Sequence, residues 1–111
     1  MSAFGLNEQI EREELGGGVS RKILKYGGKL MLVEVTMEKG GVGAAHVHPH
    51  EQISYIAKGS FEFTVGGEKQ VVKAGDSLYV APNVEHGTLS LKDGSVVVDI
   101  FTPIREDFLK K

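Results

Sequence analysis

Glycine-containing dipeptides that separate short apolar segments are the feature that most restricts the fold of this chain. Such dipeptides occur at Gly27-Gly28, Gly66-Gly67 and Asp93-Gly94. Glycine adopts at little cost the positive φ angles that two-residue hairpin turns require. We therefore expect hairpins at residues 26–29, 65–68 and 92–95, the last of them joining strands at 88–91 and 96–101.

The segments between these turns have the side-chain patterns of β-strands. Phe61–Val65 alternates apolar and polar residues, as a half-buried strand does. Val96–Phe101 is apolar on both faces apart from one acid, which predicts a strand buried on both sides. No segment keeps a helical period beyond two turns, so we expect at most short turns at Ile10–Leu15 and Arg105–Leu109. The sequence predicts an all-β fold of about nine to ten antiparallel strands, a jelly-roll or related barrel, although composition alone does not distinguish a barrel from a sandwich.

Length and charge narrow the class of protein further. The 111 residues suffice for one domain, which we place at 16–111 after an N-terminal extension at 1–15. The chain has no cysteine, so disulfides and thiolate sites are excluded. A formal net charge of −2, with acids and bases interspersed, indicates neither a nucleic-acid nor a membrane partner. Without a signal-like N-terminus, we expect a soluble, cytoplasmic protein.

Histidines are placed as metal ligands commonly are. His46 and His48 are two residues apart on a strand-like segment, so their side chains share a face. His86 lies in a separate strand region, and imidazole is a good ligand for transition metals. Gln52 has the same parity as the first pair, although Pro49 intervenes.

Some alternatives remain open around this pattern. Glu51 could be a ligand in place of Gln52, which would then be a surface amide. His50 follows a proline in an expected turn, which favours a place beside the ligands or on the surface. His86 could instead be a hydrogen-bonded core histidine.

Asp99 is the acid within the apolar segment 96–101. A carboxylate in such a strand is costly unless it is paired, hydrogen-bonded or functional. Asp99 shares a face with Phe101, and Arg105 follows shortly after. In one interpretation Asp99 exchanges protons with a substrate while Arg105 binds a substrate carboxylate. In the other, the two residues pair and only fix the C-terminal segment.

Two longer stretches resemble the motifs of the cupin superfamily. Glycine, histidine and glutamine recur with the spacing of its first motif at Gly40, His46, His48, Gln52 and Gly59, with Gln52 where many cupins have glutamate. Gly75-Asp76, Pro82 and His86 are similar to the second motif, except that Ala81 and Ser90 replace its proline and asparagine. This resemblance implies a cupin barrel in which His46, His48, Gln52 and His86 bind one divalent metal ion.

A narrower resemblance covers residues 16–109. The segments His48–Tyr55 and Asp99–Phe108 are similar to those of KdgF-type pectin-degradation cupins. That family converts cyclic 4,5-unsaturated monouronates from pectin or alginate into the linear 4-deoxy-5-keto form. The resemblance implies that Asp99, Phe101 and Arg105 line the substrate site. We expect Asp99 to be the general acid/base, Phe101 to pack on the sugar and Arg105 to bind its carboxylate.

The expected ligands carry no charge, which affects the type of reaction that the metal ion could catalyse. Three imidazoles and an amide leave the charge of a divalent ion uncompensated, which favours Lewis-acid chemistry on an anionic substrate over O₂ activation. Ni, Zn, Fe, Co and Mn all accept such ligands. The alternatives are a cupin dioxygenase and a non-catalytic sugar- or metal-binding cupin. We expect a small acidic sugar as substrate and a homodimer formed through exposed edge strands.

Overall fold

The computed structural model describes residues 2–109, which form ten β-strands and two short helical turns. The strands are β1 (Glu13–Gly16), β2 (Val19–Gly27), β3 (Leu30–Met37), β4 (Val42–His46), β5 (Glu51–Lys58), β6 (Ser60–Val65), β7 (Glu68–Lys73), β8 (Ser77–Val80), β9 (His86–Ser90) and β10 (Ser95–Thr102). The helical turns are η1 (Asn7–Gln9) and α1 (Glu106–Leu109). Over the described residues, no helix has the length and apolar character needed to cross a membrane.

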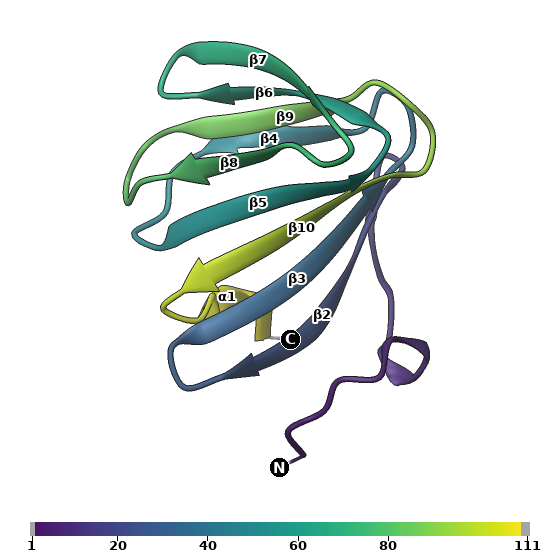
Figure 1. Ribbon diagram of the computed structural model, residues 1–111, viewed down its shortest axis with the longest axis vertical. Helices are drawn as coiled ribbons and strands as arrows, with labels where there is room; N and C mark the ends of the chain where they lie inside the picture. Colours follow the sequence, from purple (N-terminus) through teal and green to yellow (C-terminus); the bar gives the residue numbers. More distant parts are fainter. Residues whose placement is uncertain (1, 110–111) are drawn as a thin grey trace.

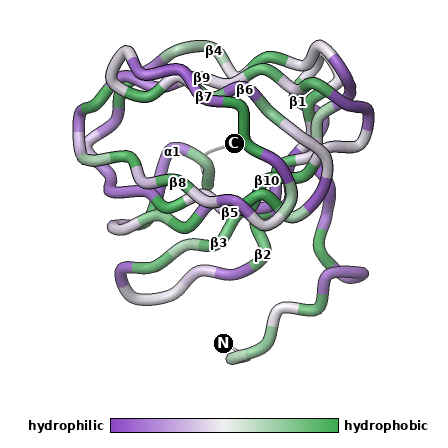
Figure 2. Tube along the Cα trace, turned by 45° about the horizontal axis from the view of Figure 1, so that its top comes forward, coloured by the Kyte–Doolittle hydropathy of each residue, from purple (hydrophilic) through white to green (hydrophobic). Residues whose placement is uncertain are grey.

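The strands form two antiparallel sheets that face each other (Figure 1). The six-stranded sheet has the order β1-β2-β3-β10-β5-β8, and the four-stranded sheet has the order β4-β9-β6-β7. Hydrophilic and hydrophobic residues alternate along much of the chain (Figure 2), as expected where one face of each sheet is buried. The predicted all-β, single-domain barrel is confirmed.

Two of the three predicted hairpins are confirmed. The turn after β2 contains Gly28 at φ 58°, and the turn after β6 contains Gly66 and Gly67 at φ 56° and 86°. In both hairpins the flanking strands pair with each other in antiparallel register.

The third predicted hairpin, at residues 92–95, is wrong. Gly94 does adopt a positive φ of 69°, but the turn joins β9 in the four-stranded sheet to β10 in the six-stranded sheet. The Asp93 side chain contacts a segment distant in the sequence, since its Oδ1 accepts a hydrogen bond from the backbone N–H of Lys39 at 2.8 Å. The Asp-Gly pair reverses the chain locally, while strand pairing depends on contacts elsewhere in the barrel.

Strand β10 lies between β3 and β5 in the six-stranded sheet. Val97 and Phe101 are each 2% exposed and point inward, whereas Ile100 on the other face is 42% exposed. The prediction of burial on both faces is therefore wrong. The strand has a neighbour along each edge, but only its inner face lies in the core.

Of the two short turns predicted near the chain ends, only the C-terminal one is correct. A C-terminal turn at Arg105–Leu109 is confirmed as α1. The turn predicted at Ile10–Leu15 is wrong, because the helical turn is η1 and residues 13–16 form β1. Since β1 pairs with β2, the last residues of the predicted extension 1–15 belong to the six-stranded sheet.

Two groups of buried apolar side chains fill the space between the sheets. The larger group comprises Met37, Ile56, Phe61, Phe63, Val72 and Val97. The smaller group comprises Met31, Val33 and Phe101, and Ile104, Phe108 and Leu109 pack against it. The second group therefore ties the C-terminal segment to the barrel interior.

Removal of a core ring should destabilise the barrel. Phe61 is fully buried, so Phe61→Ala should lower the free energy of unfolding by about 3–5 kcal/mol, measured by urea denaturation. Phe4→Ala is the matched control, because Phe4 is 77% exposed and its loss should change stability by less than about 0.5 kcal/mol. Equal effects of the two substitutions would contradict this description of the core.

Candidate functional site

Three of the four predicted ligands, His46, His48 and His86, form one cluster at the end of the four-stranded sheet. His46 is the last residue of β4 and lies opposite His86, the first residue of β9. His48 follows in the loop before β5, and its ring centroid lies 4.7 Å from that of His86. One ring nitrogen from each histidine lies within 4.8 Å of the others, so the three could hold a metal ion.

Backbone carbonyl groups fix the orientation of each imidazole. The Nδ1 atoms of His46, His48 and His86 lie 2.8, 3.1 and 2.9 Å from the carbonyl oxygens of Ala44, His50 and Val84. A carbonyl oxygen only accepts, so each Nδ1 carries the proton and each Nε2 keeps a lone pair. Within residues 2–109, the buried Nε2 of His86 has no hydrogen-bond partner. Metal-binding histidines have this arrangement.

Gln52 lies beside the histidines, and its contact with His48 fits a bound cation. The amide Nε2 of Gln52 donates to Ser54 Oγ at 2.9 Å, so its Oε1 faces His48 Nε2 at 3.0 Å. His48 already donates through Nδ1, and burial lowers the pKa of its imidazole, which disfavours a second proton. Two lone pairs therefore face each other, and a cation that accepts both removes their repulsion. The four residues thus fit a divalent metal ion.

The neighbouring residues Glu51 and His50 do not belong to this cluster. Glu51 is exposed and accepts a hydrogen bond from the hydroxyl of Tyr79, so its carboxylate is directed away from the histidines. His50 lies 3.2 Å through its Nε2 from the carbonyl oxygen of Ile104. His50 therefore connects the ligand loop to the residue just before Arg105.

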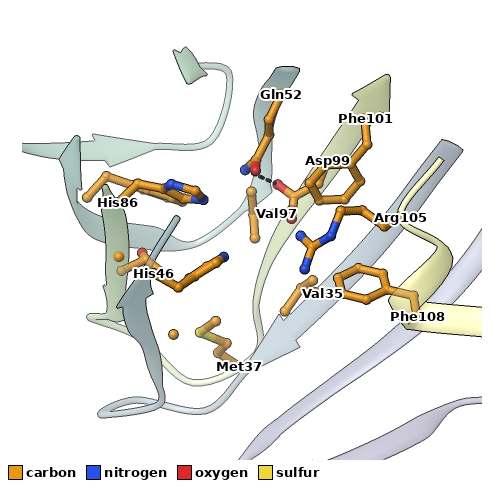
Figure 3. A pocket seen from close by; sticks show the side chains of 14 residues that line it. Val35, Met37, His46, Gln52, His86, Val97, Asp99, Phe101, Arg105 and Phe108 are labelled. Atoms are coloured by element: carbon orange, nitrogen blue, oxygen red, sulfur yellow. Dashed lines mark hydrogen bonds between the residues drawn. The ribbon is translucent and has the colours of Figure 1, made fainter. Parts of the chain in front are cut away.

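Asp99 lies in a cavity of about 120 Å³ between the two sheets. The side chains that give this cavity its chemistry are His46, Gln52, His86, Asp99, Phe101 and Arg105. In Figure 3, His46 and His86 lie on one side of it, while Asp99, Phe101 and Arg105 lie on the other. Three of the four predicted metal ligands therefore share one cavity with all three predicted substrate contacts.

The environment of Asp99 makes its carboxyl easier to protonate than that of an ordinary aspartate. Burial raises the pKa of the Asp99 carboxyl to about 6, although the hydrogen bond from Ser54 and the charge of Arg105 act in the opposite direction. Ser54 Oγ donates to Asp99 Oδ1 at 2.6 Å, and the Gln52 amide lies 3.5 Å from the same oxygen. Asp99 is thus hydrogen-bonded on one side and faces the cavity on the other.

Arg105 is buried, but its ion-pair partner is not Asp99. Its Nε and Nη2 donate to the two carboxylate oxygens of Asp107 at 3.0 and 2.8 Å. Among residues 2–109, neither a hydrogen bond nor a salt bridge joins Arg105 to Asp99. The alternative in which these two residues simply pair is therefore wrong.

Sequence reasoning missed Ser54 and Phe108. Ser54 shares the parity of Gln52 on β5, so strand alternation could have placed both on the inner face. Phe108 lines the cavity because α1 folds back against the barrel, and its position three residues after Arg105 in the expected turn could have indicated this.

Comparison with known proteins agrees with this fold and site. The cupin domain family matches residues 33–101. The pectin degradation protein KdgF of Dickeya dadantii (strain 3937) is 44% identical over 110 residues, which cover 98% of this chain and 100% of that protein.

Two solved structures superpose on almost the whole chain. An RmlC-like cupin from Shewanella frigidimarina has a TM-score of 0.91 at 41% identity, covering 97% of this chain and 96% of the other. KdgF from Halomonas sp. has a TM-score of 0.91 at 34% identity, covering 96% and 99%. This chain therefore belongs to the cupin family and, within it, to the group of pectin-degradation cupins that includes KdgF.

Proposed function

We propose that this protein opens the ring of 4,5-unsaturated monouronates to give the linear 4-deoxy-5-keto uronate. The observation that carries the proposal is the meeting of a histidine cluster that could hold a cation, a protonatable carboxyl and a buried guanidinium around one cavity. The relatives of this protein include a pectin degradation protein. Unsaturated monouronates are the sugars that lyases release from pectin and alginate.

The reaction needs a proton to be moved and an acidic sugar to be held. The C4–C5 double bond of the substrate is part of an enol ether, and C4 gains a proton as C5 becomes a ketone. The bond between C1 and the ring oxygen breaks, and the C1 hydroxyl loses its proton as C1 becomes an aldehyde. The atoms balance without an oxidant or a reductant.

Asp99 is the group that exchanges protons with the sugar. It faces the cavity, and the hydroxyl of Ser54 holds one of its oxygens at 2.6 Å. A carboxyl fixed in this way can deliver a proton to C4 and accept one from the C1 hydroxyl. The hydrogen bond from Ser54 keeps the carboxyl in one orientation while it does so.

Arg105 and Phe101 hold the substrate. The guanidinium of Arg105 can bind the sugar carboxylate through parallel hydrogen bonds. Phe101 lines the same cavity and offers an apolar surface to the sugar ring. The carboxylate is attached to C5, so its fixation also fixes the position of the reacting double bond.

His46, His48, Gln52 and His86 would hold the divalent metal ion. Held by four uncharged ligands, the ion would supply a Lewis acid for the oxygens of an anionic sugar. The neutrality of the ligands favours an anionic substrate, since none of the four ligands is a carboxylate that would offset the charge of the ion.

Asp99→Asn should abolish ring opening. The amide keeps the size of the side chain but cannot transfer the proton, so kcat should fall by at least about 100-fold. The rate is measured as the loss of ultraviolet absorbance of the double bond, and metal content by mass spectrometry should stay unchanged. Glu34→Gln is the matched control, because Glu34 pairs with Val98 on β10 away from the cavity. Full activity of Asp99→Asn would exclude the proposed role.

His86→Ala should remove the metal. The variant loses one ring of the three-histidine cluster, so bound metal should fall well below one ion per chain in elemental analysis. His50→Ala is the control, because that side chain contacts Ile104 and stands outside the cluster. Loss of metal from His50→Ala with retention in His86→Ala would refute the ligand assignment.

Ring opening should proceed at the same rate with and without O₂. The conversion leaves the overall oxidation level of the sugar unchanged, so no oxidant is consumed. Absorbance assays in anaerobic and air-saturated buffer test this directly. A strict requirement for O₂ would favour a cupin dioxygenase instead.

A further inference from the structure

We infer that Arg21 and Asp107 are positioning residues that hold Arg105 so that one edge of its guanidinium faces the cavity and selects an acidic sugar. The inference rests on the proposed function in one respect, since it takes the ligand of Arg105 to be a carboxylate. Neither Arg21 nor Asp107 lines the cavity, so both act through other side chains.

Asp107 occupies one of the two edges of the Arg105 guanidinium. Its carboxylate accepts from Nε and Nη2 at 3.0 and 2.8 Å, which is a bidentate pair. A guanidinium has a second edge, formed by Nη1 and Nη2. Over residues 2–109, Nη1 makes no hydrogen bond. The bidentate pair stops rotation of the planar group, and the free edge points toward the cavity (Figure 3).

Phe108 holds the flat face of the same guanidinium. The Cζ atom of Arg105 lies 4.2 Å from the ring centroid of Phe108 and 5.1 Å from that of Phe101. The two rings meet edge to face, with centroids 5.8 Å apart and an interplanar angle of 88°. Arg105 is therefore restrained in its plane by Asp107 and out of its plane by two aromatic rings.

Arg21 holds Phe108 in turn. Its Cζ atom lies 4.0 Å from the Phe108 ring centroid, so one ring carries two guanidinium groups. Arg21 comes from β2, its side chain is 17% exposed, and it forms a salt bridge with Glu13 of β1 at 3.2 Å. A residue on β2, which is separated from β10 by β3, thus fixes α1 against the cavity.

This arrangement gives the cavity a preference for carboxylates. The free edge of Arg105 offers two parallel N–H donors, which match the two oxygens of a carboxylate. A guanidinium that is already fixed loses little freedom when the ligand binds. Without Asp107 or Arg21, Arg105 would have to be ordered by the ligand, and affinity for the acid would fall. A neutral ligand that does not use the free edge would be affected little.

Binding of a matched pair of sugars tests this. Galacturonate and its neutral methyl ester share one ring, and the ratio of their dissociation constants, measured by calorimetry, reports on recognition of the charge. We expect Arg21→Met and Asp107→Asn each to weaken galacturonate binding by about tenfold with little change for the ester. Arg21→Lys keeps a cation over the ring and should restore part of the loss.

Two control variants separate this effect from a general loss of charge. Arg12→Met removes an arginine that donates to Ser20, and Glu106→Gln removes the acid next to Asp107. Both should bind galacturonate as the unaltered protein does. If either control lowers the affinity as much as Arg21→Met and Asp107→Asn do, the positioning role is wrong.

Arg105→Met distinguishes failure of this inference from failure of the proposed function. If Arg105→Met loses the preference for galacturonate but Arg21→Met and Asp107→Asn keep it, the positioning role is wrong and the carboxylate site stands. If Arg105→Met keeps the preference, Arg105 does not bind the carboxylate, and both the positioning role and the substrate-binding role proposed for Arg105 are overturned. A loss of the preference for galacturonate in all three variants, with metal content retained, supports the inference.

Discussion

The pairing of β10 between β3 and β5 is the interaction on which both the barrel and its cavity depend. Seven residues of β10 pair with each neighbour, and the inner face of the strand carries Val97, Asp99 and Phe101. The first contributes to the larger core group and the last to the smaller one, with the acid between them. A shift of one residue would turn Asp99 outward and bring Ile100 into the cavity, so register and chemistry are fixed together.

This strand also explains why Asp99 is retained in an apolar environment. Asp99 is opposite Ser54 in the pairing of β10 with β5, and Gln52 on the same inner face of β5 contacts both Ser54 and the acid. The chain of contacts therefore runs from His48 through Gln52 to Asp99. One amide thus joins the ligand cluster to the carboxyl, with its oxygen facing His48 and its nitrogen facing Asp99.

Much of the cavity could be predicted from the sequence because its residues obey short-range rules. The shared inner face of Gln52 and Ser54 on β5, and the cost of an acid among valines, depend only on strand geometry and desolvation. His48 joins the cluster from the loop after β4, which strand alternation does not predict. The misleading Asp93-Gly94 pair shows the limit of such rules, since a turn residue determines backbone angles and leaves the choice of sheet open. The contact of Arg21 with Phe108 joins residues far apart in the chain, and no local pattern indicates it.

The hydrogen bonds that orient the histidines have a consequence for how this protein can change over evolution. All three Nδ1 atoms bond to main-chain oxygens, those of Ala44, His50 and Val84. A main-chain oxygen is present whatever side chain its residue carries. Substitutions at these three positions that preserve the backbone path therefore leave the imidazole orientation intact. The supporting shell of the cluster is encoded in the course of the chain, so sequences can diverge around the ligands without losing them.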